Sequence, residues 1–128
     1  MNGTKLVFVY NARSGKLNSI LDAGHKIISP DTYQCKLCQL TYGPLKERKS
    51  WAAFRKSNIA SMVFFHADEF KKAYRSKFGY KFDFPVILIE NKGDLEVFID
   101  KKHLNSMEST AVLIKAIEER LHHINEKQ

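Results

Sequence analysis

The chain has 128 residues, of which 44% are apolar, 27% charged and 12% aromatic. These values are typical of a single compact globular domain over residues 1–128, and they exclude an intrinsically disordered chain. The longest apolar runs are far shorter than the roughly 20 residues that a membrane-spanning helix needs. A net charge of +7 permits an acidic partner without identifying one.

The first five residues carry one charge and no long apolar stretch follows them, so the sequence does not predict a secretory signal. We therefore expect a cytoplasmic protein, where thiols stay reduced and a structural disulfide is not expected. The two cysteines stand together as Cys35-Lys36-Leu37-Cys38. In that compartment a CxxC pair indicates redox chemistry or metal binding.

The first half of the chain begins with a predicted buried strand over residues 6–10, which are all apolar or aromatic. Apolar residues at helical spacing predict a helix from Leu17 to about Ile28, which Pro30 ends. Residues 30–45 contain the CxxC pair and predict a long irregular loop, a kind of connection that is usually functional or disordered. A short helix over about 45–58 is expected to bury Trp51 and Phe54.

The second half opens with a predicted buried strand over residues 61–66 and a helix over about 70–78. Pro85 then begins an apolar strand over 86–90, and residues 91–94 form a turn into a return strand over 95–99. Alternation in that strand predicts that Leu95, Val97 and Ile99 face the core. A last helix is expected to bury Met107, Ala111, Ile114, Ile117, Leu121 and Ile124, with Asn105 and Glu108 as a capping box.

The resulting order, β-α-loop-α-β-α-β-β-α, resembles the thioredoxin-like fold from about residue 61 to residue 124. The most specific part is Phe84 to Leu95, which is similar to the cis-proline, strand, glycine turn and strand of that family. The resemblance implies an α/β protein with a three-layer α/β/α arrangement. It also implies a central mixed sheet of about four strands, a C-terminal β-hairpin and helix, and a cis bond before Pro85.

The first half departs from the family pattern. In thioredoxins the CxxC pair follows the first central strand directly, whereas the corresponding segment here, residues 11–16, has no cysteine. Cys35 and Cys38 come after the next predicted helix, whose roughly 12 residues rise about 18 Å. The thiols are therefore expected at the opposite end of the sheet from Pro85, unless the loop folds back over the molecule.

The segment from Tyr33 to Gly43, with Asp22, His25 and Lys26 before it, is also similar to short uncharacterised bacterial proteins that carry a CxxC pair. That likeness implies no established activity. The sequence alone therefore names no substrate, and a protein or small thiol or disulfide partner is the class that redox chemistry would imply.

Three interpretations of Cys35 and Cys38 stay open. The pair could catalyse thiol–disulfide exchange, with Pro85 as the cis-proline beside it, and one cysteine would attack while the other resolves. It could instead be an inert pair that packs the loop. It could also bind zinc together with His25, although a closed site needs a fourth ligand.

Two basic runs, 46–56 and 71–81, raise a further alternative of binding nucleic acid or an acidic partner. Their aromatic residues have helical spacing, which predicts that they belong to the core rather than to a base-stacking surface. A charge run is usually a solvated helix face. No cofactor-binding motif is present, because Arg13-Ser14-Gly15-Lys16 lacks the flanking residues of a phosphate-binding loop, and no pattern indicates an oligomeric state.

Overall fold

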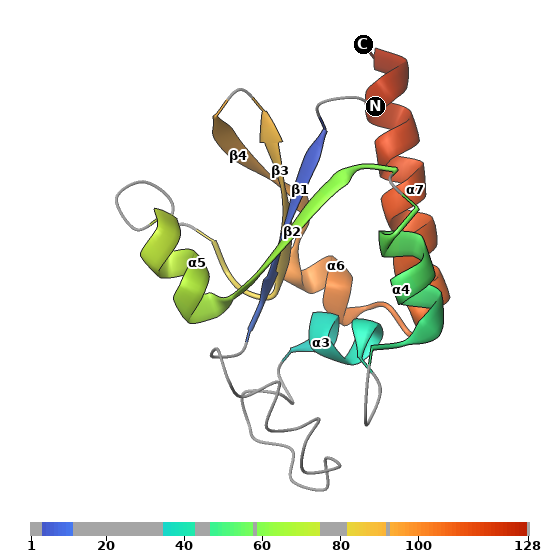
Figure 1. The fold of residues 1–128 in the computed structure, drawn as a ribbon, viewed down its shortest axis with the longest axis horizontal. Helices are drawn as coiled ribbons and strands as arrows, with labels where there is room; N and C mark the ends of the chain where they lie inside the picture. Colours follow the sequence, from blue (N-terminus) through green and yellow to red (C-terminus); the bar gives the residue numbers. More distant parts are fainter. Residues whose placement is uncertain are drawn as a thin grey trace, which may run out of the picture.

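The computed structural model describes residues 4–11, 35–42, 47–57, 59–74, 82–91 and 93–127. Four strands and five helices lie in these ranges (Figure 1). In chain order they are β1 Lys5–Tyr10, α3 Lys36–Thr41, α4 Lys49–Arg55, β2 Ser61–His66, α5 Ala67–Tyr74, β3 Val86–Asn91, β4 Asp94–Ile99, α6 Lys101–Asn105 and α7 Thr110–Lys127. The helix predicted over 17–28 lies outside the described residues.

The four strands form one mixed sheet in the order β2-β1-β3-β4. β1 and β2 are parallel, with Lys5 opposite Ser61 and Tyr10 opposite His66. β3 runs antiparallel to β1, and β4 runs antiparallel to β3. Gly93 adopts a φ of 88° in the connection between β3 and β4, a conformation that favours glycine. The prediction of an α/β protein with a mixed four-stranded sheet is confirmed.

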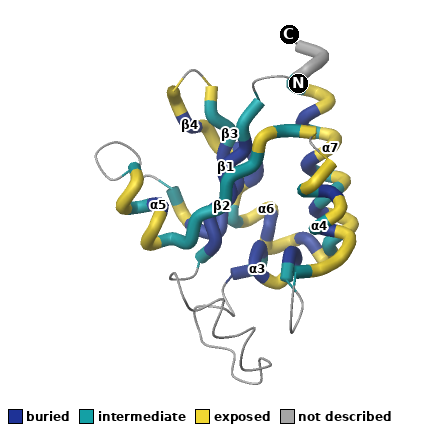
Figure 2. The backbone as a smooth tube through the Cα atoms, in the orientation of Figure 1, coloured by how far each residue is buried: buried dark blue, intermediate teal, exposed yellow. Residues whose placement is uncertain are grey.

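Helices pack on both faces of the sheet. On one face the even-numbered residues of β1 join buried side chains of α3, α4, α6 and α7, including Trp51 and Ile117. On the other face Val7 and Val9 pack with Phe70 of α5. Figure 2 shows the resulting buried centre along β1, with exposed surfaces on the outer helix faces. Because β1 is buried on both faces, it is the continuous apolar run that the sequence predicts.

Two predictions, one for each half of the chain, need correction. The segment predicted as an irregular loop over 30–45 contains the helix α3, whose Leu37 and Leu40 are buried one turn apart. The strand predicted as buried over 61–66 is β2, an edge strand whose residues are only partly buried or exposed. An apolar run alone does not reveal which strand of a sheet has a neighbour on one side only.

The alternation predicted for β4 is wrong at its end. The register between β3 and β4 shifts between Ile87 and Leu88, where Ile87 faces Ile99 and Leu88 faces Val97. One extra residue on β4 therefore rotates the strand. As a result Phe98 and Ile99 both enter the core at 5% and 1% exposure, while Val97 is 49% exposed.

The closing segment is two helices rather than one. Asp100 caps α6, because its side-chain oxygen accepts a hydrogen bond from the backbone N–H of His103. Asn105 is the last residue of α6, so the predicted capping box with Glu108 does not form. The hydroxyl of Ser109 instead accepts from the N–H of Val112 in the first turn of α7. Met107 is buried between the two helices, and Ala111 is exposed.

The bulge makes neighbouring residues of β4 unequal in their contribution to stability. Phe98→Ala should lower the free energy of unfolding by about 3–5 kcal/mol, because it leaves a cavity in the core. Val97→Ala should change it by less than about 1 kcal/mol, since Val97 is already 49% exposed. Urea unfolding of both variants measures the difference. Strict alternation along β4 would instead place Val97 in the core, and it predicts a larger loss of stability for Val97→Ala than for Phe98→Ala.

Candidate functional site

The CxxC pair begins a short helix. Cys35 is the N-cap residue of α3, and its sulfur accepts a hydrogen bond from the backbone N–H of Cys38 at 3.2 Å. A side chain that satisfies a free N–H in the first turn stabilises a helix start. Leu37, Cys38 and Leu40 then turn toward the core. The three-residue spacing of the cysteines thus coincides with one helical turn, which brings the two sulfurs together.

Cys35 and Cys38 form a disulfide, with their Cα atoms 5.2 Å apart. This bond was not expected from the cytoplasmic assignment. The sulfur of Cys35 also accepts a hydrogen bond from the backbone N–H of Asn11, at 3.3 Å. Asn11 directly follows β1, so this contact fixes the pair at the carboxyl end of the central strand. Cys35 is 0% exposed and Cys38 is 2% exposed.

The peptide bond between Phe84 and Pro85 is cis, the conformation implied by the thioredoxin resemblance. Val86 faces Val9 in the ladder between β3 and β1. Pro85 directly precedes β3, so it lies at the end of the sheet where β1 finishes. Cys35 and Pro85 therefore belong to the same end of the sheet. The expectation of opposite ends is wrong, because Cys35 at the start of α3 accepts a hydrogen bond from Asn11, which directly follows β1.

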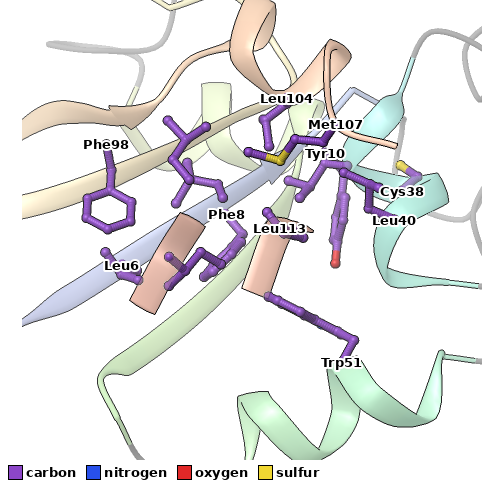
Figure 3. Close-up of a cluster of buried hydrophobic side chains, with 14 of the residues drawn as sticks. Leu6, Phe8, Tyr10, Cys38, Leu40, Trp51, Phe98, Leu104, Met107 and Leu113 are labelled. Atoms are coloured by element: carbon purple, nitrogen blue, oxygen red, sulfur yellow. The ribbon is translucent and has the colours of Figure 1, made fainter. Parts of the chain in front are cut away.

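The end of β1 also carries a buried phenol. The hydroxyl of Tyr10 lies 3.4 Å from Oγ1 of Thr41, which donates to the carbonyl of Leu37 at 2.8 Å. Figure 3 shows Tyr10 with Cys38 and Leu40 at one end of the core cluster. Burial raises the pKa of Tyr10 well above the usual 10.0, and the hydrogen bond with Thr41 lowers it by less. Tyr10 is therefore a neutral side chain that ties β1 to α3.

A second group of contacts stabilises the carboxyl end of α3. Tyr42 pairs with Glu47 in an isolated bridge, and the Glu47 carboxylate accepts two hydrogen bonds from the Arg55 guanidinium at 2.7 and 2.8 Å. That pairing raises the pKa of Arg55. Burial, and then the nearby Glu47 charge, raise the pKa of Tyr42. These contacts hold the carboxyl end of α3 in place. The Glu47 carboxylate is paired with the Arg55 guanidinium.

His66 ends β2 beside Tyr10, with ring centroids 6.2 Å apart. The Glu69 carboxylate accepts from the backbone N–H of His66 and contacts its Nδ1, both at 2.8 Å. These hydrogen bonds, the backbone one most strongly, lower the pKa of Glu69. Asp68 and Glu69 lie in the first turn of α5, where negative charges favour a helix start. Sequence reasoning did not single out His66 as part of this end of the sheet.

The zinc alternative depends on His25, which lies outside the described residues. Within the described ranges, no group of three or more His, Cys, Asp or Glu side chains could hold a metal ion. The basic runs are described only in part. In the first run Trp51 and Phe54 are buried, which confirms that they are core residues rather than a base-stacking surface.

An open pocket of about 510 Å³ adjoins the segment that leads into β3. Apolar side chains and charges of both signs line it, namely Phe82, Asp83, Val86, Val97, Asp100, Lys101, Lys102 and Asn105. Phe82 and Asp83 come shortly before Pro85, and Asp100 is already used as the cap of α6. The pocket therefore lies next to the cis-proline and contains neither cysteine.

Comparison with known proteins gave no relative: no family model, no curated protein and no solved structure matches the chain. No helix among the described residues combines the length and the apolar character needed to cross a membrane. The site therefore has to be interpreted from its own geometry.

The buried phenol gives a pH-dependent prediction. The pKa of Tyr10 is raised in the folded state, so the unfolded chain loses this proton first as the pH rises above about 10. The free energy of unfolding should therefore fall above pH 10 in the wild type, and less steeply in Tyr10→Phe. Urea unfolding between pH 8 and about pH 11 measures both slopes. Equal slopes would contradict a buried, neutral Tyr10.

Proposed function

We propose that this chain is a thioredoxin-like protein that exchanges disulfides through Cys35 and Cys38. The observation that carries the proposal is the position of the disulfide, hydrogen-bonded to the N–H after β1 at the sheet end that also holds the cis bond before Pro85. The strand order β2-β1-β3-β4, with helices on both faces, supports the three-layer arrangement of that fold. We further propose a cytoplasmic location, where the pair would cycle rather than stay oxidised.

The hydrogen bonds assign different roles to the two sulfurs. In the disulfide form, the N–H groups of Asn11 and Cys38 both donate to the Cys35 sulfur, at 3.3 and 3.2 Å, and both would face this sulfur after reduction. Hydrogen bonds to a charged acceptor are stronger than those to a neutral one, so this sulfur is the one that carries a thiolate. Cys35 is then the attacking residue and Cys38 the resolving residue.

The exchange balances without a cofactor. The Cys35 thiolate attacks one sulfur of a substrate disulfide, and the other substrate sulfur leaves as a thiolate that takes a proton from solvent. Cys38 loses its proton to solvent and attacks the Cys35 sulfur of the mixed disulfide. The second substrate sulfur leaves and is protonated in turn. The substrate gains two electrons and two protons, and the Cys35–Cys38 bond forms again.

A second candidate function is structural. Both cysteines are buried, so a substrate can reach them only when the chain that covers them moves. A bond that closes so short a loop stabilises a fold by about 2 kcal/mol in the chain-entropy account. In this alternative the disulfide serves only to hold the start of α3.

Single serine variants separate the roles of the cysteines. The reduced wild type should release thiolate from 5,5′-dithiobis(2-nitrobenzoic acid) and regain its disulfide. The reaction of Cys38→Ser should stop at a stable mixed disulfide on Cys35. Cys35→Ser should react with the reagent at least about tenfold more slowly than Cys38→Ser. Mass spectrometry of the products and the absorbance of the released thiolate measure both outcomes.

The wild type and the two serine variants together also test the structural alternative. If the folded wild type shows no reversible dithiol–disulfide transition in dithiothreitol mixtures, exchange is excluded. A loss of about 2 kcal/mol in unfolding free energy on reduction would then support the purely structural bond. Equal reactivity of Cys35→Ser and Cys38→Ser would contradict the assigned roles while leaving exchange itself intact.

A further inference from the structure

We propose that the free edge of β2 binds a second copy of this chain, so that two sheets join through antiparallel β2 strands. β2 ends the described sheet on one side (Figure 1). Its sequence from Ser61 to Phe65 carries no charged residue and consists largely of apolar and aromatic side chains. An edge strand of this kind is a template for pairing with another strand. The proposal is independent of the cysteine chemistry.

The backbone of β2 shows which groups are available. The N–H of Ser61 donates to the carbonyl of Thr4, so Ser61 and, by alternation, Val63 and Phe65 point toward β1. Met62, Phe64 and His66 therefore point their backbone groups away from the sheet. The N–H of His66 confirms this direction, because it donates to the Glu69 carboxylate rather than to β1.

These directions select one register. With a two-fold axis at Val63, Met62 of each copy lies opposite Phe64 of the other copy. These two pairs of residues form four backbone hydrogen bonds. The His66 N–H is already occupied by Glu69, so a shift of the axis to Phe65 would lose this donor. In the favoured register, Met62 and Phe64 meet on the same face as a sulfur–aromatic pair, and the two Val63 side chains meet on the other face.

The opposite edge of the sheet is protected against such pairing. β4 contains the bulge at Phe98 and carries two acidic residues, Asp94 and Glu96. Bulges and charges are the features by which edge strands avoid one another. β2 has no register shift against β1 over its six residues. Two copies therefore meet without like charges within the paired segment, and the outward backbone groups of Met62 and Phe64 match those of a second β2, which is the argument for a second copy as the occupant.

The test uses the full chain at increasing concentration. Sedimentation should show a mass that rises to twice that of one chain. Hydrogen exchange should show the Met62 and Phe64 amides becoming protected as the dimer forms, while the Val63 and Phe65 amides are protected at every concentration. The amide measurement needs no substitution, so it does not depend on whether a variant folds.

Two matched variants each remove one outward-facing edge N–H. Met62→Pro alters β2 without removing a hydrogen bond to β1, and it should stay monomeric. Val97→Pro makes the same change on β4, where the register turns the Val97 N–H away from β3, and it should still dimerise. A wild type that remains monomeric at millimolar concentration with freely exchanging Met62 and Phe64 amides would overturn the proposal. So would a dimer that Val97→Pro abolishes and Met62→Pro preserves.

Discussion

The hydrogen bond from the backbone N–H of Asn11 to the Cys35 sulfur connects the sheet to the candidate site. Asn11 is the first residue after the central strand, and the ladder between β1 and β3 ends two residues earlier, at Val9 and Val86. The Cys35 sulfur thus accepts a backbone N–H that lies beyond the last pair of this ladder. α3, which Cys35 caps, is thereby placed under the carboxyl end of β1, and its Leu37 and Leu40 complete the core there.

Several weaker contacts depend on that placement. Thr41 reaches Tyr10 only because α3 lies across the end of β1, and the Leu40 carbonyl accepts from the Thr110 hydroxyl of α7 at 2.6 Å. Each neutral hydrogen bond contributes about 1 kcal/mol, so none of them alone fixes the helix. Together with the burial of Leu37 and Leu40, they hold a six-residue helix that would not be stable in isolation. Contacts to β1 and α7 therefore hold both ends of α3.

The sequence predicted most of the scaffold and only part of the site. The strands at 6–10, 61–66, 86–90 and 95–99 were visible because apolar runs bounded by turn residues are strong local signals. α3 was missed because its helical pattern is limited to one turn and is interrupted by polar residues. The location of Cys35 was predicted at the wrong end, since its contact with Asn11 is a tertiary contact with no local signature. The bulge at Phe98 was missed for the same reason, as strict alternation is the default for a strand.

The central claim is that the Asn11 N–H stabilises a thiolate on Cys35, and one comparison tests it directly. Asn11→Pro removes this N–H, whereas Asn11→Ala keeps it and serves as the control. Equilibration of both variants with mixtures of reduced and oxidised dithiothreitol at neutral pH measures the dithiol–disulfide constant. We predict that Asn11→Pro favours the disulfide about fivefold more than Asn11→Ala, because this N–H binds a thiolate about 1 kcal/mol more strongly than it binds the disulfide sulfur, and the proline variant loses that difference. Equal constants for the two folded variants would contradict it.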